Sequence, residues 1–302
     1  MAYNCVVCVK QVPDTKRITG QAMKEDGTVN RAALPAIFNP EDLNALEEAL
    51  RVRDRHGGTV TVVAMGLPAA CDVLRDALFR GADRAILITD RRAAASDTLA
   101  TSYILSCAVR KLNPDLVFCG RQAIDGDTAQ VGPQLAEKIE FTLVTYLEEL
   151  QLDGRTARVR RNIGNGFEVV RSKLPALFTV MDSANQPRPP ALKKELKFKK
   201  ARAPVEVAKA VEGAMASATP EARTEESRRR CEELAAQGLL ITQWNLDDLQ
   251  ADLKWCGGAG SPTKVHRIQS IVLAGGDYKE FPPTDDGVGR LLAELIEDHT
   301  IG

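Results

Sequence analysis

The sequence predicts an α/β protein with a doubly wound, mostly parallel sheet, helices on both faces, an antiparallel extension and a C-terminal arm. Two observations favour this fold. Short β-branched segments alternate with amphipathic helix patterns in the first half of the chain, as in parallel sheets with crossover helices. After residue 140 the hydrophobic pattern changes to alternation, which is typical of antiparallel strands.

Four buried strands are predicted in the first half, at residues 5–9, 59–65, 84–89 and 115–119. Each is short, rich in β-branched residues and apolar at successive positions. A strand covered on both faces needs this pattern, because both sets of its side chains face helices.

The crossover helices are predicted at residues 41–56, 70–80 and 97–112. Mostly apolar residues recur at helical spacing within each, which gives every helix one apolar face. A glycine follows the first helix at Gly57 and the second at Gly81, and glycine at this position commonly ends a helix.

Three antiparallel strands are predicted at residues 143–151, 156–163 and 166–172. Asp153-Gly154 and Asn165-Gly166 lie between them, and such dipeptides are favoured in hairpin turns. We therefore expect an antiparallel addition to the sheet.

The last third of the chain carries weaker signals. From Asn185 onward prolines are interspersed with lysines, so we expect a loop or extended arm outside the core. Residues 221–237 predict a polar helix that is exposed or faces a partner. A glycine-rich turn at 257–260 and an amphipathic helix at 286–298 follow.

Composition excludes several classes of protein. The 302 residues include 40 Lys and Arg against 41 Asp and Glu, a formal net charge of -1, which is unlike a generally basic nucleic-acid binder. No run approaches the ~20 apolar residues that span a bilayer, and no basic segment precedes the short apolar stretch at the N-terminus. We expect a cytoplasmic protein without membrane insertion.

The seven cysteines are scattered and odd in number, which favours a reducing compartment over a disulfide framework. Cys5 and Cys8 have the spacing of a metal or redox motif, but they lie within a predicted strand, where residues three apart point to opposite faces. His56, His266 and His299 lack ligand-like spacing to cysteines or carboxylates. The sequence therefore predicts no metal site.

Two predicted helix starts follow strands of the parallel sheet, where ligands of open α/β sheets bind. The first groups the hydroxyls of Ser96, Thr98, Thr101 and Ser102. Two interpretations stay open at this point. Ser96 or Asp97 could be an ordinary N-cap, or the backbone N–H groups and hydroxyls could hold a phosphate.

The second helix start is the segment from Gly120 to Gln134. Gly126 would permit a tight bend, and Asp127 or Thr128 could cap the helix that follows. The segment is neither a Walker A motif nor G-x-G-x-x-G, so an ordinary NAD site is not indicated. A capped helix after a functionless loop is the alternative to a ligand-binding loop.

Phosphate capture alone cannot hold a nucleotide. A helix N-terminus contributes about 0.3–1 kcal/mol per anion, or roughly 2 kcal/mol in sheltered sites, whereas nanomolar binding needs about 12 kcal/mol. An adenine pocket must supply the remainder. We expect it at the strand ends around Cys8, around Asn39 to Asp42 and around Met65-Gly66.

Several segments together resemble the beta subunit of electron transfer flavoprotein. They are Val9 to Thr15, Asn39 to Asp42, Gly81 to Arg84, Gly120 to Gly132 and, late in the chain, Gly260 to Val265. The resemblance implies an adenine-nucleotide-binding α/β subunit that pairs with a flavin-carrying alpha subunit and relays electrons without substrate turnover of its own. It divides the chain into a nucleotide-binding domain at 1–200 and a C-terminal arm with helices contacting the alpha subunit at 201–302.

The family has two versions of this site, one holding AMP as a structural piece and one holding a second FAD at which electrons from NADH are bifurcated. Gln11 to Thr15, Asp97 to Tyr103 and Asp125 to Pro133 look like the FAD version. The pyrophosphate of FAD carries one more phosphate than AMP, which two helix N-termini with grouped hydroxyls could neutralise.

The resemblance also implies individual roles. The adenosine would lie against Cys8, Asn39, Asp42, Met65 and Gly66. The extra phosphate and the flavin side would meet Asp97, Thr98 and Thr101. The ribose and phosphates would be wrapped by Ala123, Asp125, Gly126, Asp127, Thr128, Ala129, Gln130, Val131, Gly132, Pro133 and Gln134.

Asn185 to Arg188, followed by Leu192, resembles the recognition loop of the family, in which an exposed leucine anchors on a partner dehydrogenase. The segment departs from the family at Lys193-Lys194-Glu195, where a small apolar stretch is expected. The identity of the dehydrogenase therefore stays open, and a solvated basic loop without a partner is the alternative interpretation. RNA binding is disfavoured because Phe198 is the only aromatic residue among these lysines.

The implied partners are an alpha subunit, an acyl-CoA dehydrogenase, and ferredoxin or a quinone-linked oxidoreductase as further acceptors. Two other classes of function remain as alternatives. An adenylate-forming or ATP-hydrolysing enzyme would need a pyrophosphate-release motif or a metal-binding carboxylate pair, and neither is visible. A scaffold that binds nucleotide only for stability is the other. The extra length between residues 204 and 256 is a docking element or a surface insertion.

Overall fold

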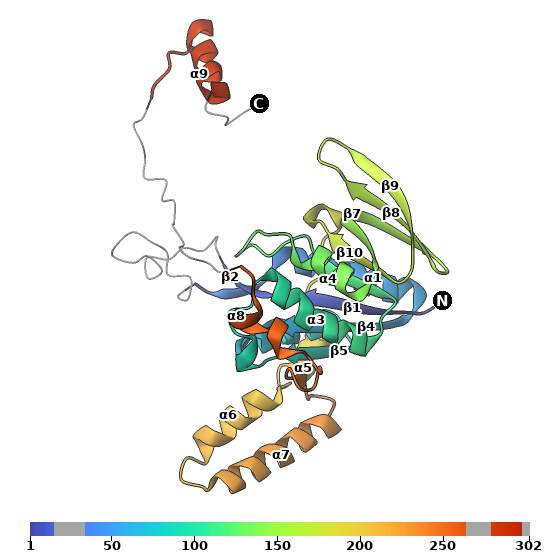
Figure 1. Ribbon diagram of the computed structural model, residues 1–302, viewed down its shortest axis with the longest axis vertical. Coiled ribbons are helices and arrows are strands. Elements are labelled where there is room, and N and C mark those ends of the chain that lie inside the picture. Colours follow the sequence, from blue (N-terminus) through green and yellow to red (C-terminus); the bar gives the residue numbers. More distant parts are fainter. Residues whose placement is uncertain (15–33, 264–278, 298–302) are drawn as a thin grey trace.

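A computed structural model describes residues 1–14, 34–263 and 279–297 of the chain. Within this part the main sheet runs in the order β11-β5-β4-β1-β6-β10-β7-β8-β9, and it forms the body of the molecule in Figure 1. Its strands are β1 (Tyr3–Val9), β4 (Gly58–Met65), β5 (Arg84–Ile88), β6 (Leu116–Gly120), β7 (Thr142–Asp153), β8 (Thr156–Asn162), β9 (Phe167–Lys173), β10 (Ala176–Val180) and β11 (Thr242–Trp244). The predicted α/β fold is confirmed.

Helices connect and cover these strands. They are α1 (Pro40–His56), α2 (Cys71–Arg80), α3 (Thr98–Leu112), α4 (Val131–Ile139), α5 (Leu192–Phe198), α6 (Pro204–Ala214), α7 (Pro220–Ala236), α8 (Gly257–Gly260) and α9 (Asp285–Glu297). The short strands β2 (Gln11–Pro13) and β3 (Ala36–Phe38) pair separately.

Two apolar layers lie on opposite faces of the sheet. Leu50 of α1 and Leu74 of α2 belong to one layer, and Ile104 of α3 and Leu135 of α4 belong to the other. All four side chains are completely buried. This arrangement explains why the central strands are apolar on both faces.

The four strands predicted in the first half are observed as β1, β4, β5 and β6. The alternating segments after residue 140 form β7, β8 and β9, whose pairings with one another are antiparallel, as predicted. β10 was not predicted, although it pairs in parallel with both β6 and β7. β11 was also not predicted and pairs in parallel with β5. The division of the chain at residue 200 stays a prediction.

The region from Asn185 to Arg202 needs a correction. It is irregular up to Ala191, as expected, but Leu192–Phe198 forms α5, which packs beside α2. Ala201 is fully buried in the core, so the arm does not lie wholly outside it.

The helical hairpin of α6 and α7 projects from the body of the molecule, and so does the β8–β9 hairpin (Figure 1). α7 matches the predicted polar helix and has no buried residue, whereas α6 was not predicted. The glycine-rich segment at 257–260 is a short helix, α8, rather than a turn. The predicted last helix is observed as α9, and residue 298 lies outside the described residues.

No helix among the described residues has both the length and the apolar character needed to cross a membrane. Cys5 and Cys8 belong to different apolar layers, as the strand pattern predicts, so the two thiols do not share a site.

Candidate nucleotide site

The amino end of α1 joins two strand ends at the carboxyl edge of the sheet. Asn39 is fully buried, and its Nδ2 donates to the carbonyl oxygen of Gln122 at 2.8 Å. The N–H of Ile124 donates to Asn39 Oδ1 at 3.2 Å. Asn39 therefore fixes the first part of the loop that follows β6.

Asp42 performs a similar role one turn later. Its carboxylate accepts from the N–H of Lys10 at 2.9 Å, just beyond β1, and from the N–H of Gly120 at 3.1 Å, at the end of β6. Burial raises the pKa of Asp42 to about 7, despite these hydrogen bonds, which act to lower it. Asp42 thus ties β1, β6 and α1 together.

Gly120 is required by this close approach. A Cβ at Gly120 would lie 2.5 Å from Asp42 Oδ1 and 2.7 Å from the carbonyl carbon of Glu41. Only a residue without a side chain lets the end of β6 pack against the amino end of α1.

The sequence interpretation missed two charged residues that shape the same loop. Glu41 accepts from Arg121 Nη2 at 2.7 Å and from the N–H of Gln122 at 2.9 Å. Lys10 Nζ lies 2.7 Å from Asp125 Oδ2. The position of Glu41 in the first turn of a predicted helix was the available signal, but its partner lies 80 residues away in sequence.

α4 begins at Val131 with Gln130 at the N-cap and no side-chain cap, so the prediction that Asp127 or Thr128 caps this helix is wrong. The bends of the loop lie at Asp127 and Ala129, which have φ values of 48° and 51°. Gly126 lies in a turn in which its N–H donates to the Ala123 carbonyl oxygen at 3.2 Å, and its backbone is not left-handed.

The amino end of α4 is consequently open. Within the described part of the chain, no acceptor meets the N–H groups of Val131 and Gly132. Unpaired N–H groups at a helix N-terminus, together with the helix dipole, favour an anion.

Three predicted site residues meet beside this helix end. Thr98 Oγ1 donates to Gln130 Oε1 at 2.8 Å, and Gln134 Nε2 lies 3.4 Å from Thr98 Oγ1. Gln134 Oε1 is buried and has no hydrogen-bond partner. A buried acceptor without a donor is costly, so this oxygen fits the hydroxyl of a bound ligand.

The amino end of α3 is occupied by the chain itself. The Asp97 carboxylate accepts from the N–H of Ala100 at 2.9 Å, which confirms the N-cap interpretation. It also accepts from the N–H of Thr263 at 3.0 Å and from its hydroxyl at 2.7 Å. Partial burial acts to raise the pKa of Asp97, but these hydrogen bonds hold it below its ordinary value.

The hydroxyls at the start of α3 divide into two groups. Ser96 and Ser102 donate to the nearby carbonyl oxygens of Ala93 and Leu99. The Thr98 hydroxyl bonds to Gln130, and the hydroxyl of the half-buried Thr101 makes no hydrogen bond to any described residue. Of these four hydroxyls, that of Thr101 has no partner among the described residues, and that of Thr98 is bonded to another residue of the candidate site.

The residues expected around the adenine lie at neighbouring strand ends. Cys8 near the end of β1 and Met65 at the end of β4 border the same apolar layer as Cys119. The contact with Cys8 and complete burial raise the pKa of the Cys119 thiol well above its ordinary value. Gly66 is exposed, and its N–H donates to Ile88 at the end of β5.

Loop residues between Ala123 and Pro133 lie around the start of α4. Asp127 accepts from Gln122 Nε2 at 3.1 Å, whereas Thr128 is exposed and makes no hydrogen bond within the described residues. Gly132 is buried, and a Cβ there would lie 2.8 Å from Thr179 Cγ2.

The two residues of the expected partner surface differ in their surroundings. Arg188 Nε lies 2.7 Å from Glu47 Oε2, and Arg188 Nη1 lies 2.9 Å from Asp54 Oδ2, which holds the arm on α1. Leu192 is 69% exposed at the start of α5. Leu196, one turn later, is 56% exposed.

No group of three or more metal-ligating side chains is found across residues 1–14, 34–263 and 279–297. His56 stacks edge-on against Tyr3 at 5.4 Å between ring centroids. His266 and His299 lie outside the described residues, as do Thr15, Lys264 and Val265 of the resembling segments.

Comparison with known proteins identifies the family. Residues 26–212 match the electron transfer flavoprotein domain. The chain is 38% identical to the electron transfer flavoprotein subunit beta of Clostridium acetobutylicum, over 99% of this chain and 100% of the relative. It is 41% identical to protein FixA of Azorhizobium caulinodans, over 97% and 93%. It is 36% identical to the caffeyl-CoA reductase-Etf complex subunit CarD of Acetobacterium woodii, over 98% and 99%.

The domain match covers more than half of this chain, and the alignments cover nearly the full length of each relative. The chain therefore belongs to the electron transfer flavoprotein family, among its beta subunits and FixA proteins.

Proposed function

We propose that the chain binds FAD at the carboxyl edge of its sheet and serves as the beta subunit of a bifurcating electron transfer flavoprotein. The observation that carries this proposal is the buried, unpartnered Gln134 Oε1 beside Thr98 and the open amino end of α4. A hydroxyl and a phosphate group of one nucleotide would satisfy both features.

The residues of this chain would bind and orient the nucleotide. The N–H groups of Val131 and Gly132 would bind a phosphate, and Gln134 would accept from a ribose or ribityl hydroxyl. Thr98 and Thr101 would meet the second phosphate. Bound FAD would supply the redox chemistry, and the protein would supply its placement.

AMP is the second candidate, and one specific observation favours it. Asp97 already places a carboxylate at the amino end of α3, so only one of the two helix ends is open to an anion. A single phosphate matches a single open end more simply than a pyrophosphate does. The hydroxyls of Thr98 and Thr101 are what favour FAD over AMP.

We further propose that the chain pairs with a flavin-carrying alpha subunit, accepts electrons from NADH and passes them to an acyl-CoA dehydrogenase and to ferredoxin or a quinone-linked oxidoreductase. The relative from Acetobacterium woodii is named as a subunit of a caffeyl-CoA reductase complex, which supports a CoA-ester-reducing partner. The exposed Leu192 and Leu196 on α5 would be the apolar anchors for that partner.

The decisive experiment is acid release of cofactor from the purified heterodimer, with FAD and AMP quantified separately. We expect two FAD per heterodimer. One FAD with one AMP would contradict bifurcation at this site but support the nucleotide site itself. If the heterodimer released only the flavin of the alpha subunit, with no second FAD and no AMP, both bifurcation and the nucleotide site in this chain would be contradicted.

The variant Thr98→Val with Thr101→Val separates a redox role from a structural one. We expect loss of the second FAD and of NADH-dependent electron transfer, because both hydroxyls would contact the cofactor. Arg158→Gln, on the distant β8, is the matched control and should retain both. Normal electron transfer in the double variant would support a scaffold that binds nucleotide only for stability.

A further inference from the structure

A polar notch of about 170 Å³ lies at the amino edge of the sheet, the edge away from the nucleotide site. It is lined by the first residues of β1 and β4, by Arg84 at the start of β5 and by Lys111 in the last turn of α3. Neither the family assignment nor the proposed function gives this notch a role.

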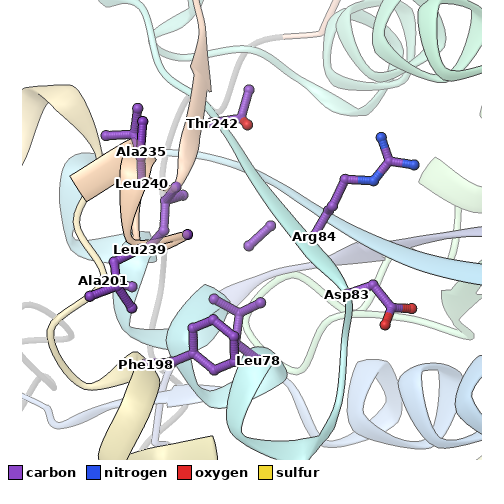
Figure 2. Close-up of a pocket in the computed structure, with 12 residues that line it drawn as sticks. Leu78, Asp83, Arg84, Phe198, Ala201, Ala235, Leu239, Leu240 and Thr242 are labelled. Carbon is purple, nitrogen blue, oxygen red and sulfur yellow. The ribbon is translucent and has the colours of Figure 1, made fainter. Parts of the chain in front are cut away.

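The side chains of Thr61 and Arg84 share one face of the sheet. The two residues are paired across β4 and β5. Each lies two positions before a residue of the α3 and α4 layer, Val63 and Ile86, so their side chains point to that layer. Figure 2 shows a different cavity, and there Arg84 points away from the apolar walls formed by Leu78 and other residues.

The notch presents hydrogen-bond donors that have no partner. The Arg84 side chain is exposed and makes no hydrogen bond or ion pair with any described residue, and its guanidinium carries five donors. Thr61 is only 3% exposed, yet its hydroxyl lines the notch without a partner in the described chain. The Asn4 side-chain amide also donates to none of these residues.

Two side-chain acceptors at or beside the notch already have donors. Asn4 Oδ1 accepts from Thr59 Oγ1 at 2.9 Å. Lys111 Nζ donates to the Asp248 carbonyl oxygen at 2.8 Å and keeps two further donors. Asp115, which follows the lining residue Pro114, accepts from the N–H of Asn4 and from Arg155.

We infer that this notch binds the phosphate group of a small anion, held by Arg84, Lys111 and the Thr61 hydroxyl. Side-chain donors without a partner and two cations from different elements suit a ligand that accepts hydrogen bonds and carries negative charge. The volume of the notch leaves room for a small organic group, so the source is inorganic phosphate or a small phosphate monoester.

The test is equilibrium dialysis of the full-length chain with radiolabelled inorganic phosphate at constant ionic strength. Arg84→Gln should weaken one class of sites about tenfold or more, because a charge-assisted bond is lost. Thr61→Val should weaken the same class, and Thr61→Ser should restore it because the hydroxyl is retained. If unlabelled glycerol phosphate displaces the labelled phosphate better than unlabelled phosphate does, the notch is a site for a phosphate monoester. If the two compete equally, it is a site for free phosphate.

Two controls separate this notch from the nucleotide site. Arg158→Gln removes an exposed arginine that has no ion pair with described residues and should leave phosphate binding unchanged. Thr98→Val should affect only phosphate held at the nucleotide site. The inference is overturned if Arg84→Gln and Thr61→Val bind phosphate as the unaltered chain does, or if Arg158→Gln weakens binding as much as Arg84→Gln.

Discussion

Single buried residues organise the carboxyl edge of the sheet, and Asp42 is the clearest example. A carboxylate that accepts two backbone N–H groups is normally stabilised as the anion, but complete burial has the larger effect here. Asn39 and Asp42 were predicted to border the adenosine. The structure shows their side chains bonded to their own chain, so any contribution to binding is made through the loop they support.

The pKa of Asp42 predicts a pH-dependent stability. The pKa is about 7 in the folded protein against an ordinary value of 3.8, so the folded state holds one more proton between these values. This stabilising contribution is complete below the ordinary pKa and is lost as the pH rises through about 7, with a slope of at most about 1.4 kcal/mol per pH unit.

Urea unfolding of the wild-type chain and of Asp42→Asn across this pH range tests the prediction. The wild-type free energy of unfolding should fall with rising pH relative to that of Asp42→Asn, which cannot titrate. Glu212→Gln, on the exposed side of α6, should match the wild-type dependence. Parallel curves for wild type and Asp42→Asn would show that Asp42 titrates normally.

The glycines of the site loop differ in what they contribute. Gly120→Ala should destabilise the chain by about 1–3 kcal/mol, because the new Cβ meets Asp42 and the backbone of Glu41 at less than normal contact distance. Gly126→Ala is the matched control: it has nothing within 4 Å and should change stability by no more than about 0.5 kcal/mol. The midpoints of denaturant unfolding measure both changes in stability. Equal effects of the two substitutions would contradict the close packing of Gly120 against the start of α1.

At the scale of elements, the start of α3 is joined to the C-terminal segment through Asp97. The same carboxylate caps α3 and accepts two hydrogen bonds from Thr263. Ser261, which is buried, donates from its hydroxyl to the carbonyl oxygen of Gly257 and accepts from the N–H of Asp97. The late sequence motif therefore closes against a helix more than 150 residues earlier.

Removing this carboxylate should destabilise the chain. Asp97→Ala loses the cap, which costs about 0.5–2 kcal/mol, and releases Thr263 as well. Asp97→Asn keeps a side-chain acceptor and should retain most of the stability. Urea unfolding measures both. An Asp97→Ala chain as stable as the Asn variant would show that the carboxylate contributes neither cap nor tether.

Helices and strands with a strong local sequence pattern could be predicted, whereas strands that form only because they pair with another strand could not. α7 followed from its charges and helix formers, and β7 to β9 followed from their alternation and turn dipeptides. β11 has three residues and exists because β5 offers an unpaired edge. β10 is a short apolar run that periodicity alone does not distinguish from a helix segment.

At the scale of the whole molecule, the sequence predicted that the candidate-site residues share one edge of the sheet, as the structure shows, but it did not predict the hydrogen bonds among them. The strand-then-helix order brings residues 8, 39, 65, 98 and 120–134 to the carboxyl ends of parallel strands. Which groups are already occupied depends on contacts such as Thr98 with Gln130 and Asp97 with Thr263, which no local pattern encodes. For the same reason, the open end of α4 and the capped end of α3 look alike in sequence.

The most direct measurement of the central claim is a crystal structure of the heterodimer with the nucleotide it carries on purification. A phosphate should lie within hydrogen-bond distance of the N–H groups of Val131 and Gly132, with a ligand hydroxyl donating to Gln134 Oε1. The claim is contradicted if this chain's nucleotide lies elsewhere, or if those groups turn instead to side chains of the partner subunit.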